Sequence, residues 1–168
     1  MSYSSPIPAP TTLNTVLATL QGFEKRLLNG IVYHLPMQDI CNLLKSTDLT
    51  HILAATDGGS KLTTASFGWT LRRLNTDLIS CSGPVDGLSL TSFRAESYGF
   101  ASFVLFLSIF HKLHPLPLST LVVYLDSESL IKRIQQHLSL SYTTPSHATS
   151  CDQDVLLIVY RFLSLLPI

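Results

Sequence analysis

The sequence predicts an α/β fold in which a mixed sheet of three antiparallel strands and one parallel strand is flanked by helices. Three strand-like runs with short links follow one another between residues 51 and 81, which indicates an antiparallel meander. A long helical run and then a continuous apolar run come next. A helix of that length can return the chain parallel to the first strand. With 168 residues, the chain is long enough for one such domain.

Composition narrows the class of protein further. Hydrophobic residues make up 46% of the chain and charged residues only 13%, which excludes a disordered, highly charged protein. Lys and Arg number 11, as do Asp and Glu, so neither a basic arm nor an acidic tail dominates. Any contact with nucleic acid must therefore come from a local patch. The three cysteines lack zinc-site spacing and are expected to be buried free thiols.

The first 50 residues are expected to precede the domain as a flexible lead-in and helical connector. Residues 1–12 are rich in Ser, Pro and Thr, and apolar residues then recur at helical spacing over residues 13–28. A second short helix is expected over residues 36–44. The predicted domain itself covers residues 51–168.

Each strand of the meander has its own signal. HILAATD, residues 51–57, is a short apolar strand bounded by a turn at Gly58-Gly59. ASFGWTLRR, residues 65–73, alternates large apolar with small or polar side chains, as a half-buried strand does. DLISC, residues 77–81, completes the meander, and the sequence after it is typical of a loop.

The elements that follow are more apolar. Residues 92–113 form one helix that is apolar almost all round, hence buried on most sides. Its apolar core is too short for a membrane span, which needs about 20 residues. LVVYLD, residues 121–126, is typical of a central parallel strand covered on both faces. Ser127 can cap the next helix, whose expected buried face ends at Leu138, and a last helix is expected over residues 152–166.

Three acids stand in apolar surroundings. Asp57 ends the first strand, Glu96 lies in the first turns of the long helix, and Asp126 ends the parallel strand. If these two strands are neighbours, their aspartates emerge side by side and the helix brings Glu96 over the same point. Three such carboxylates need a compensating cation, and Mg²⁺ takes oxygen ligands of this kind. Two ions about 4 Å apart can activate a water and stabilise the leaving oxygen of a phosphodiester.

Each acid also has a simpler interpretation when it is taken alone. An Asp before Gly-Gly is commonly a turn residue, a Glu near a helix start is favoured by the helix dipole, and Asp126 can cap the strand end. The three together, in this order and on these elements, favour the metal site.

Four segments, TDGGS, FGWTL, SFRAESYG and VVYLDSESL, resemble the ribonuclease H domain of non-LTR retrotransposon reverse transcriptase polyproteins. The resemblance covers residues 52–167. It implies that Asp57, Glu96 and Asp126 hold two Mg²⁺ ions, or Mn²⁺ in their place, and that the RNA strand of an RNA–DNA hybrid is cleaved. The order of the acids differs from that of proofreading exonucleases, which carry a second acid where Gly59 stands, and of integrases, in which the Glu comes last.

Contacts with a hybrid substrate are expected near the first carboxylate. Gly58 and Gly59 let backbone approach a strand closely, Ser60 offers a hydroxyl, and Arg94 is placed to bind a phosphate. A hybrid is read mainly through its shape and 2′-hydroxyls, without base sequence. The alternatives are a turn for the glycines, a turn hydroxyl for Ser60 and a surface ion pair for Arg94.

The resemblance also implies a longer domain. In the family, a fifth strand, a His-bearing loop and a helix with a fourth acid follow, whereas this chain ends at Ile168. We therefore expect a domain truncated at its C-terminus, once part of a longer polyprotein, with an exposed sheet edge. Asp152 and Asp154 are interpreted as cap and dipole residues of the last helix.

Three functions remain open at this point: a hybrid-specific endonuclease, an inactive remnant that folds and at most binds nucleic acid, and a small membrane-associated protein, which hydropathy alone suggests. The first two are favoured; they would have no membrane partner, and a cytoplasmic or nuclear location is expected.

Overall fold

The structure is a computed structural model, and it describes residues 12–45, 52–87, 89–116, 118, 121–139 and 152–167. Its helices are α1 (Leu13–Thr19), α2 (Gly22–Leu28), α3 (Met37–Lys45), α4 (Ser92–Leu113), α5 (Glu128–Leu138) and α6 (Gln153–Leu163). Its strands are β1 (Ile31–Tyr33), β2 (Ile52–Lys61), β3 (Thr64–Arg73), β4 (Thr76–Pro84) and β5 (Val122–Leu125).

The strands form one mixed five-stranded sheet in the order β1-β4-β3-β2-β5. β2, β3 and β4 form the expected antiparallel meander, and β5 pairs parallel with β2 after the crossover through α4. The predicted α/β fold with a mixed sheet is therefore confirmed. The sheet has one strand more than predicted, because β1 adds to the outer edge of β4.

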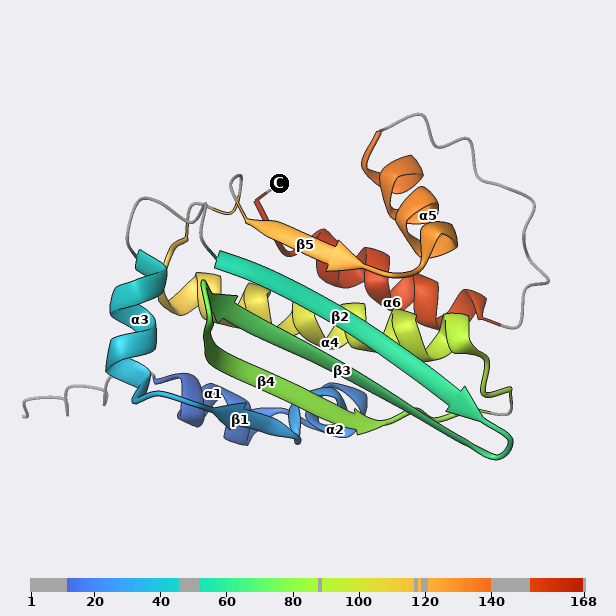
Figure 1. Ribbon diagram of the computed structural model, residues 1–168, viewed down its shortest axis with the longest axis horizontal. Coiled ribbons are helices and arrows are strands. Elements are labelled where there is room, and N and C mark those ends of the chain that lie inside the picture. Colours follow the sequence, from blue (N-terminus) through green and yellow to red (C-terminus); the bar gives the residue numbers. More distant parts are fainter. Residues whose placement is uncertain are drawn as a thin grey trace, which may run out of the picture.

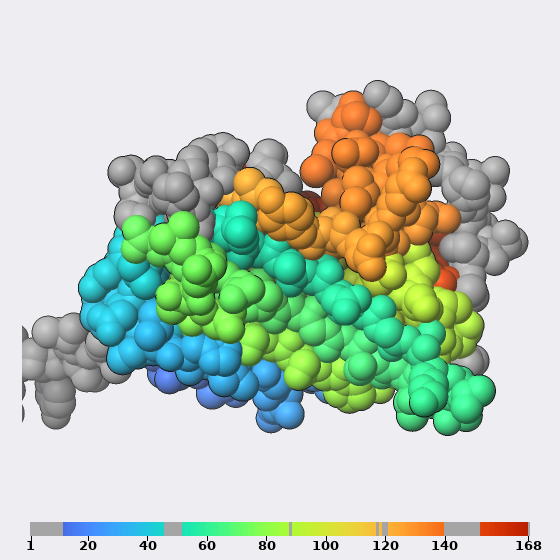
Figure 2. Space-filling model, viewed as in Figure 1, coloured from blue at the N-terminus to red at the C-terminus, as the bar shows by residue number. Residues whose placement is uncertain are grey.

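Helices cover one face of this sheet. Figure 1 shows α1, α2, α4 and α6 behind the strands, while no helix of the described chain lies over the front face. α5 lies beyond the end of β5 and packs against it and against α4. The front face is the one shown in Figure 2. Among the described residues, one broad face of the sheet is thus left uncovered.

The central helix α4 has the predicted bounds and is buried along most of its length. By length and composition it is the one described helix that could cross a membrane, but 89% of its apolar window is buried inside the domain. Phe103, Phe106 and Phe110 are fully buried on it. The indole nitrogen of Trp69 in β3 donates to Ser102 Oγ at 2.8 Å, which satisfies a polar group within the core. These contacts identify α4 as a core helix.

The N-terminal region is part of the same domain. Its buried side chains share the core with the sheet, namely those of Leu13, Leu27, Leu28, Ile40 and Leu44. The described residues of the expected lead-in and helical connector therefore pack against the predicted domain, and the boundary expected at residue 50 lies outside the described residues. Residues 13–28 form two helices instead of one, because Leu20 is extended (ψ 145°) and Gly22 has φ +54°.

Two strands differ from their predictions, β2 in its length and β5 in its burial. β2 continues through Gly58-Gly59 to Lys61, so the turn falls at Leu62 and Thr63. β5 was expected to be covered on both faces, but it is the edge strand of the described sheet, with Val122 43% and Tyr124 58% exposed. The apolar run that predicts burial is thus partly exposed, since nothing in the described chain pairs with its outer edge.

The predictions for the cap of α5, for its buried face and for the cysteines are confirmed in part. Ser127 caps α5 as predicted, and its Oγ accepts from the Leu130 amide at 3.4 Å. Leu138, expected on the buried face of α5, is 48% exposed. Of the cysteines, Cys41 and Cys81 are buried free thiols as predicted, and burial raises the pKa of Cys81 to about 11. Cys151 lies outside the described residues.

Candidate functional site

The sheet register places two of the three predicted carboxylates side by side. β2 and β5 pair in parallel up to Thr56 and Leu125, and Asp57 and Asp126 are the next residues on the two strands. Both aspartates are exposed. Asp57 alternates with the buried Thr56, so its side chain points to the uncovered face of the sheet. The expectation that these strand ends are neighbours is confirmed.

Glu96 is held next to this pair by a close approach of helix and strand. A Cβ on Gly58 would overlap the backbone of Ala95 and Glu96, so only glycine lets α4 cross β2 at this point. A Cβ on Gly99, one turn further along α4, would lie 3.0 Å from the Asp57 carbonyl oxygen. These contacts position the backbone of Glu96 beside the residue that follows Asp57. The Gly58 position is therefore required by packing, and neither glycine of the pair lies in a turn.

The oxygen atoms of the three carboxylates are accessible as metal ligands. Asp57 Oδ1 accepts a hydrogen bond from the Gly58 amide at 2.7 Å. Within the described part of the chain, no Lys or Arg forms an ion pair with Asp57, Glu96 or Asp126. Among those same residues, no three acidic, His or Cys side chains converge closely enough to hold a metal ion as they stand. The backbone thus brings the three residues together, but their side chains do not form a cluster.

Arg94, expected at the substrate, lies inside the domain. The residue is 6% exposed, and its two terminal nitrogens donate to the Asp154 carboxylate at 2.8 and 2.6 Å. Its Nε donates to the Asp86 carbonyl at 2.8 Å, and the guanidinium stacks over the Tyr98 ring at 5.5 Å. This hydrogen bonding lowers the pKa of Asp154 and raises that of Arg94. A phosphate contact would require this ion pair to open.

A second set of bonds joins the starts of α4 and α6. Thr91 caps α4 by accepting from the Arg94 amide at 2.9 Å, and its hydroxyl donates to Asp152 Oδ2 at 3.0 Å. Asp152 stands at the N-cap of α6 but makes no side-chain cap bond. Both aspartates of α6 instead bind Arg94. Sequence reasoning missed this network because its partners lie about 60 residues apart and no local pattern links them.

The remaining residues predicted to contact the substrate, Gly59 and Ser60, lie near the end of the β2–β3 hairpin. Ser60 Oγ is 3.2 Å from Ser92 Oγ at the start of α4, whereas a Cβ on Gly59 would meet open space. A shallow cavity of about 280 Å³ opens beside them and is lined by Gly59, Ser60, Lys61, Thr64, Ala65 and Ser66. Lys61 was not among the predicted contacts, yet it supplies the cation of this surface.

The uncovered sheet face next to Asp57 is lined by small side chains. Asp57 pairs with Gly68 on β3, and Gly68 pairs with Ser82 on β4. Neighbouring pairs add Thr70 and Ser80 to the same face. Glycine and small hydroxyl-bearing residues therefore lead from Asp57 across the sheet on this face.

These features define the class of site: paired strand-end carboxylates on an α/β domain, beside an open sheet face. Comparison of the chain with protein-family models, with curated proteins and with solved structures finds no match.

Proposed function

We propose that this domain is a nuclease of the ribonuclease H type that cleaves the RNA strand of an RNA–DNA hybrid by two-metal phosphodiester hydrolysis. The observation that carries the proposal is the register of Asp57 and Asp126 on neighbouring parallel strands. The packing of Gly58 against α4 adds Glu96 to that pair. The order of acids and elements is that of the family which the sequence resembles. With this function we also propose an origin in a longer polyprotein and a cytoplasmic or nuclear location.

The donor set suits Mg²⁺. Asp57, Glu96 and Asp126 offer only carboxylate oxygens, which hard divalent cations prefer. Two of the three are exposed, and Glu96 is half-buried. When bound, the ions would activate a water and stabilise charge on the phosphate. The three side chains must turn toward one another to hold them, as binding of a cation favours, because the charge of the ion offsets their mutual repulsion.

The open sheet face suits a duplex that is recognised by its shape. Small side chains at Gly68 and Ser82 leave room for a phosphate backbone, and Lys61 and Ser60 can contact it at the hairpin. Hybrids expose 2′-hydroxyls in a shallow minor groove, which flat surfaces with hydroxyl groups can read. In this arrangement Arg94 holds the start of α4, and with it Glu96, rather than the substrate.

A cleavage assay tests the proposal. The chain is incubated with Mg²⁺ and a hybrid whose RNA strand carries an end label, and duplex DNA serves as a second substrate. We expect cleavage of the RNA strand only, and Asp126→Asn to slow it at least about 100-fold through loss of a metal ligand. Glu128→Gln, two residues away and paired with Lys132 at 2.7 Å, should leave the rate unchanged. Cleavage without Mg²⁺, or an unaffected Asp126→Asn variant, would contradict the proposal.

A non-catalytic domain that only binds nucleic acid is the second candidate. The observation that favours it is that no three candidate ligand side chains converge within the described residues. Thermal unfolding during a Mg²⁺ titration separates the two candidates. A metal site predicts stabilisation of about 2.7 kcal/mol at 100 times the dissociation constant, absent from Asp57→Asn. A melting temperature that Mg²⁺ does not change would favour the non-catalytic domain.

A further inference from the structure

Arg133 is a half-buried cation in the second turn of α5, the helix that follows Asp126. α5 packs against β5 and α4, and Figure 1 shows it beyond the end of β5. The Cα–Cβ bonds of a helix tilt toward its N-terminus. The side chain of Arg133 therefore leaves the helix in the direction of the end that adjoins Asp126.

The position of α5 gives it access to the candidate site around the edge of the sheet. β5 pairs with β2 only as far as Thr56, so within the described chain β2 has no partner on that side beyond this residue. The start of α4 backs the same stretch of β2, since Gly58 packs against it and Ser60 Oγ lies 3.2 Å from Ser92 Oγ. Residues on α5 thus approach the carboxylates past this open edge.

An aromatic ring on α4 holds the guanidinium of Arg133 in place. Arg133 Cζ lies 5.5 Å from the centre of the Phe93 ring, and Phe93 is itself half-buried against the core. Phe93 stands three residues before Glu96, which makes the two side chains neighbours on the surface of α4. The guanidinium therefore lies close to the turn of α4 that carries Glu96, on a helix that starts beside Asp126.

The N–H groups of Arg133 are available to a ligand. In the part of the chain that the structure describes, no carboxylate lies within ion-pair distance of Arg133, whereas the adjacent Lys132 pairs with Glu128 at 2.7 Å. A guanidinium over an aromatic ring keeps the donors along its edge, and their planar fork matches two oxygens of a phosphate. Arg133 thus has the position and the free donors of a phosphate-binding residue.

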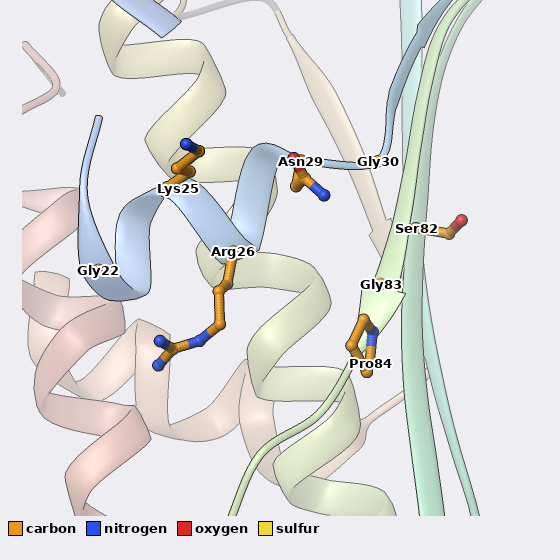
Figure 3. Close-up of a pocket in the computed structure, with 8 residues that line it drawn as sticks. All are labelled: Gly22, Lys25, Arg26, Asn29, Gly30, Ser82, Gly83 and Pro84. Carbon is orange, nitrogen blue, oxygen red and sulfur yellow. The ribbon is translucent and has the colours of Figure 1, made fainter. Parts of the chain in front are cut away.

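Other cations of the described chain are engaged or lie elsewhere. Arg94, the predicted phosphate contact, is held inside the domain by its ion pair. Lys25 and Arg26 line a cavity of about 300 Å³ between α2 and the end of β4, which Figure 3 shows. That cavity lies on the helix-covered side of the sheet, and β3 separates β4 from β2. Arg133 is therefore the described arginine that both adjoins the carboxylates and keeps its donors.

We propose that Arg133 binds a backbone phosphate of the RNA strand beside Asp57, Glu96 and Asp126. The inference rests on the proposed function and names a substrate-binding residue for it. The contact would hold the strand at the carboxylates and offset part of the repulsion between their charges and the phosphate. Phe93 is the positioning residue of this contact, because its ring fixes the guanidinium.

Hybrid binding in EDTA tests the contact separately from cleavage. A fluorescent hybrid of about 20 base pairs is titrated with the chain and followed by anisotropy at several salt concentrations. We expect Arg133→Gln to weaken binding roughly three- to tenfold and to lower the salt slope by about 1, because one phosphate contact is lost. Arg133→Lys keeps the charge and should retain the slope, but it should bind more weakly than the unaltered chain because the planar fork is lost.

Lys132→Gln is the matched control. It removes the same charge at the next position of α5, where the side chain is 65% exposed and paired with Glu128. Adjacent residues of a helix point about 100° apart, so Lys132 does not share the direction of Arg133. This variant should bind as the unaltered chain does. Arg133→Gln breaks no ion pair of the described chain, so it is expected to fold, and its melting temperature checks this.

The outcomes separate the two proposals. If Arg133→Gln binds the hybrid as tightly as the unaltered chain, or if Lys132→Gln loses as much affinity, the role of Arg133 is overturned whatever the cleavage assay shows. Absence of hybrid binding by the unaltered chain also overturns it, as does loss of the salt slope in Arg133→Lys. If the variants behave as expected but no Mg²⁺-dependent cleavage occurs, the phosphate contact stands and the nuclease proposal fails.

Discussion

Gly58 and Gly59 are adjacent in the sequence but have different surroundings in the fold. Gly58 faces the backbone of α4, and a Cβ there would overlap Ala95 and Glu96, whereas a Cβ on Gly59 would meet open space. At the residue scale, the candidate site therefore depends on one missing methyl group. Without that close approach, Glu96 could not lie next to the strand that carries Asp57.

This difference predicts that alanine destabilises the domain at one of the two positions and is tolerated at the other. Gly58→Ala should destabilise the domain by about 1–3 kcal/mol, because it forces α4 away from β2. Gly59→Ala is its control and should change the free energy of unfolding by less than about 0.5 kcal/mol. Urea denaturation of the three proteins measures both values. Equal stability of the two variants would show that the approach of α4 to β2 is not tight.

The hairpin turns also depend on single residues. Leu62 and Leu74 have φ of +51° and +52°, which is unusual for residues other than glycine. They begin two-residue turns, a position that usually takes glycine. Both leucines are more than half exposed, so neither pays for its strain by burial. At the first turn, Leu62 and Thr63 are not typical turn residues, so the sequence predicts the turn at Gly58-Gly59 instead and ends β2 too early.

At the scale of elements, the starts of α4 and α6 are joined by one buried arginine. Arg94 binds Asp154 through two hydrogen bonds and lies 3.5 Å from Asp152 Oδ1. Asp152 is buried, with 7% of its surface exposed, and it contacts the arginine inside the domain. α6 is thereby fixed against the same turn of α4 that carries Glu96. The ion pair couples the geometry of the site to the packing of the last described helix.

The lowered pKa of Asp154 predicts a pH dependence of stability. A carboxyl group whose pKa is lower in the folded state stabilises the fold above its unfolded pKa, near 3.8, and loses that contribution as pH falls through the folded value. Asp154→Asn should therefore be less stable than the unaltered chain at pH 7, and the difference should shrink below about pH 4. Urea denaturation at pH 7, 5 and 3 measures it.

Asp77→Asn is the control for this prediction. Asp77 pairs with Arg72 at 2.6 Å on the surface, where the side chain is half exposed and such pairs contribute little. Its substitution should have a small effect at every pH. A difference between Asp154→Asn and the unaltered chain that stays constant from pH 7 to pH 3 would contradict the assigned role of the ion pair.

For the molecule as a whole, the sheet is asymmetric. Within the part of the chain that the structure describes, helices cover one face and none covers the other, and β5 is an edge strand on which Val122 and Tyr124 are exposed. The formal net charge of zero gives the chain no general repulsion against its own copies. An exposed, partly apolar edge strand is a template for pairing with another chain. The open face serves the proposed substrate, whereas the open edge favours self-association.

Tyr124→Lys tests this consequence of the edge. A charge on an edge strand discourages pairing between copies, so the variant should remain monomeric at concentrations where the unaltered chain associates. Its melting temperature should change little, because Tyr124 is 58% exposed. Light scattering over a concentration series measures the association.

Leu62→Lys at the hairpin tip is the control. Tyr33→Lys is not suitable because Tyr33 packs against the core. If the two lysine variants associate equally, the edge of β5 is not the site of contact.

Local patterns in the sequence determined the order of elements from β2 onward, the full length of α4, the meander and the identity of the three acids. They could do so because period-two alternation, helical periodicity and caps depend on residues close in sequence. Tertiary structure alone decided that β1 joins the sheet, that Arg94 is buried against Asp154 rather than exposed, and that β5 is an edge of the described sheet. Each of these depends on pairing between segments far apart in the chain, whose free energy comes from burial and ion pairing that no local pattern records.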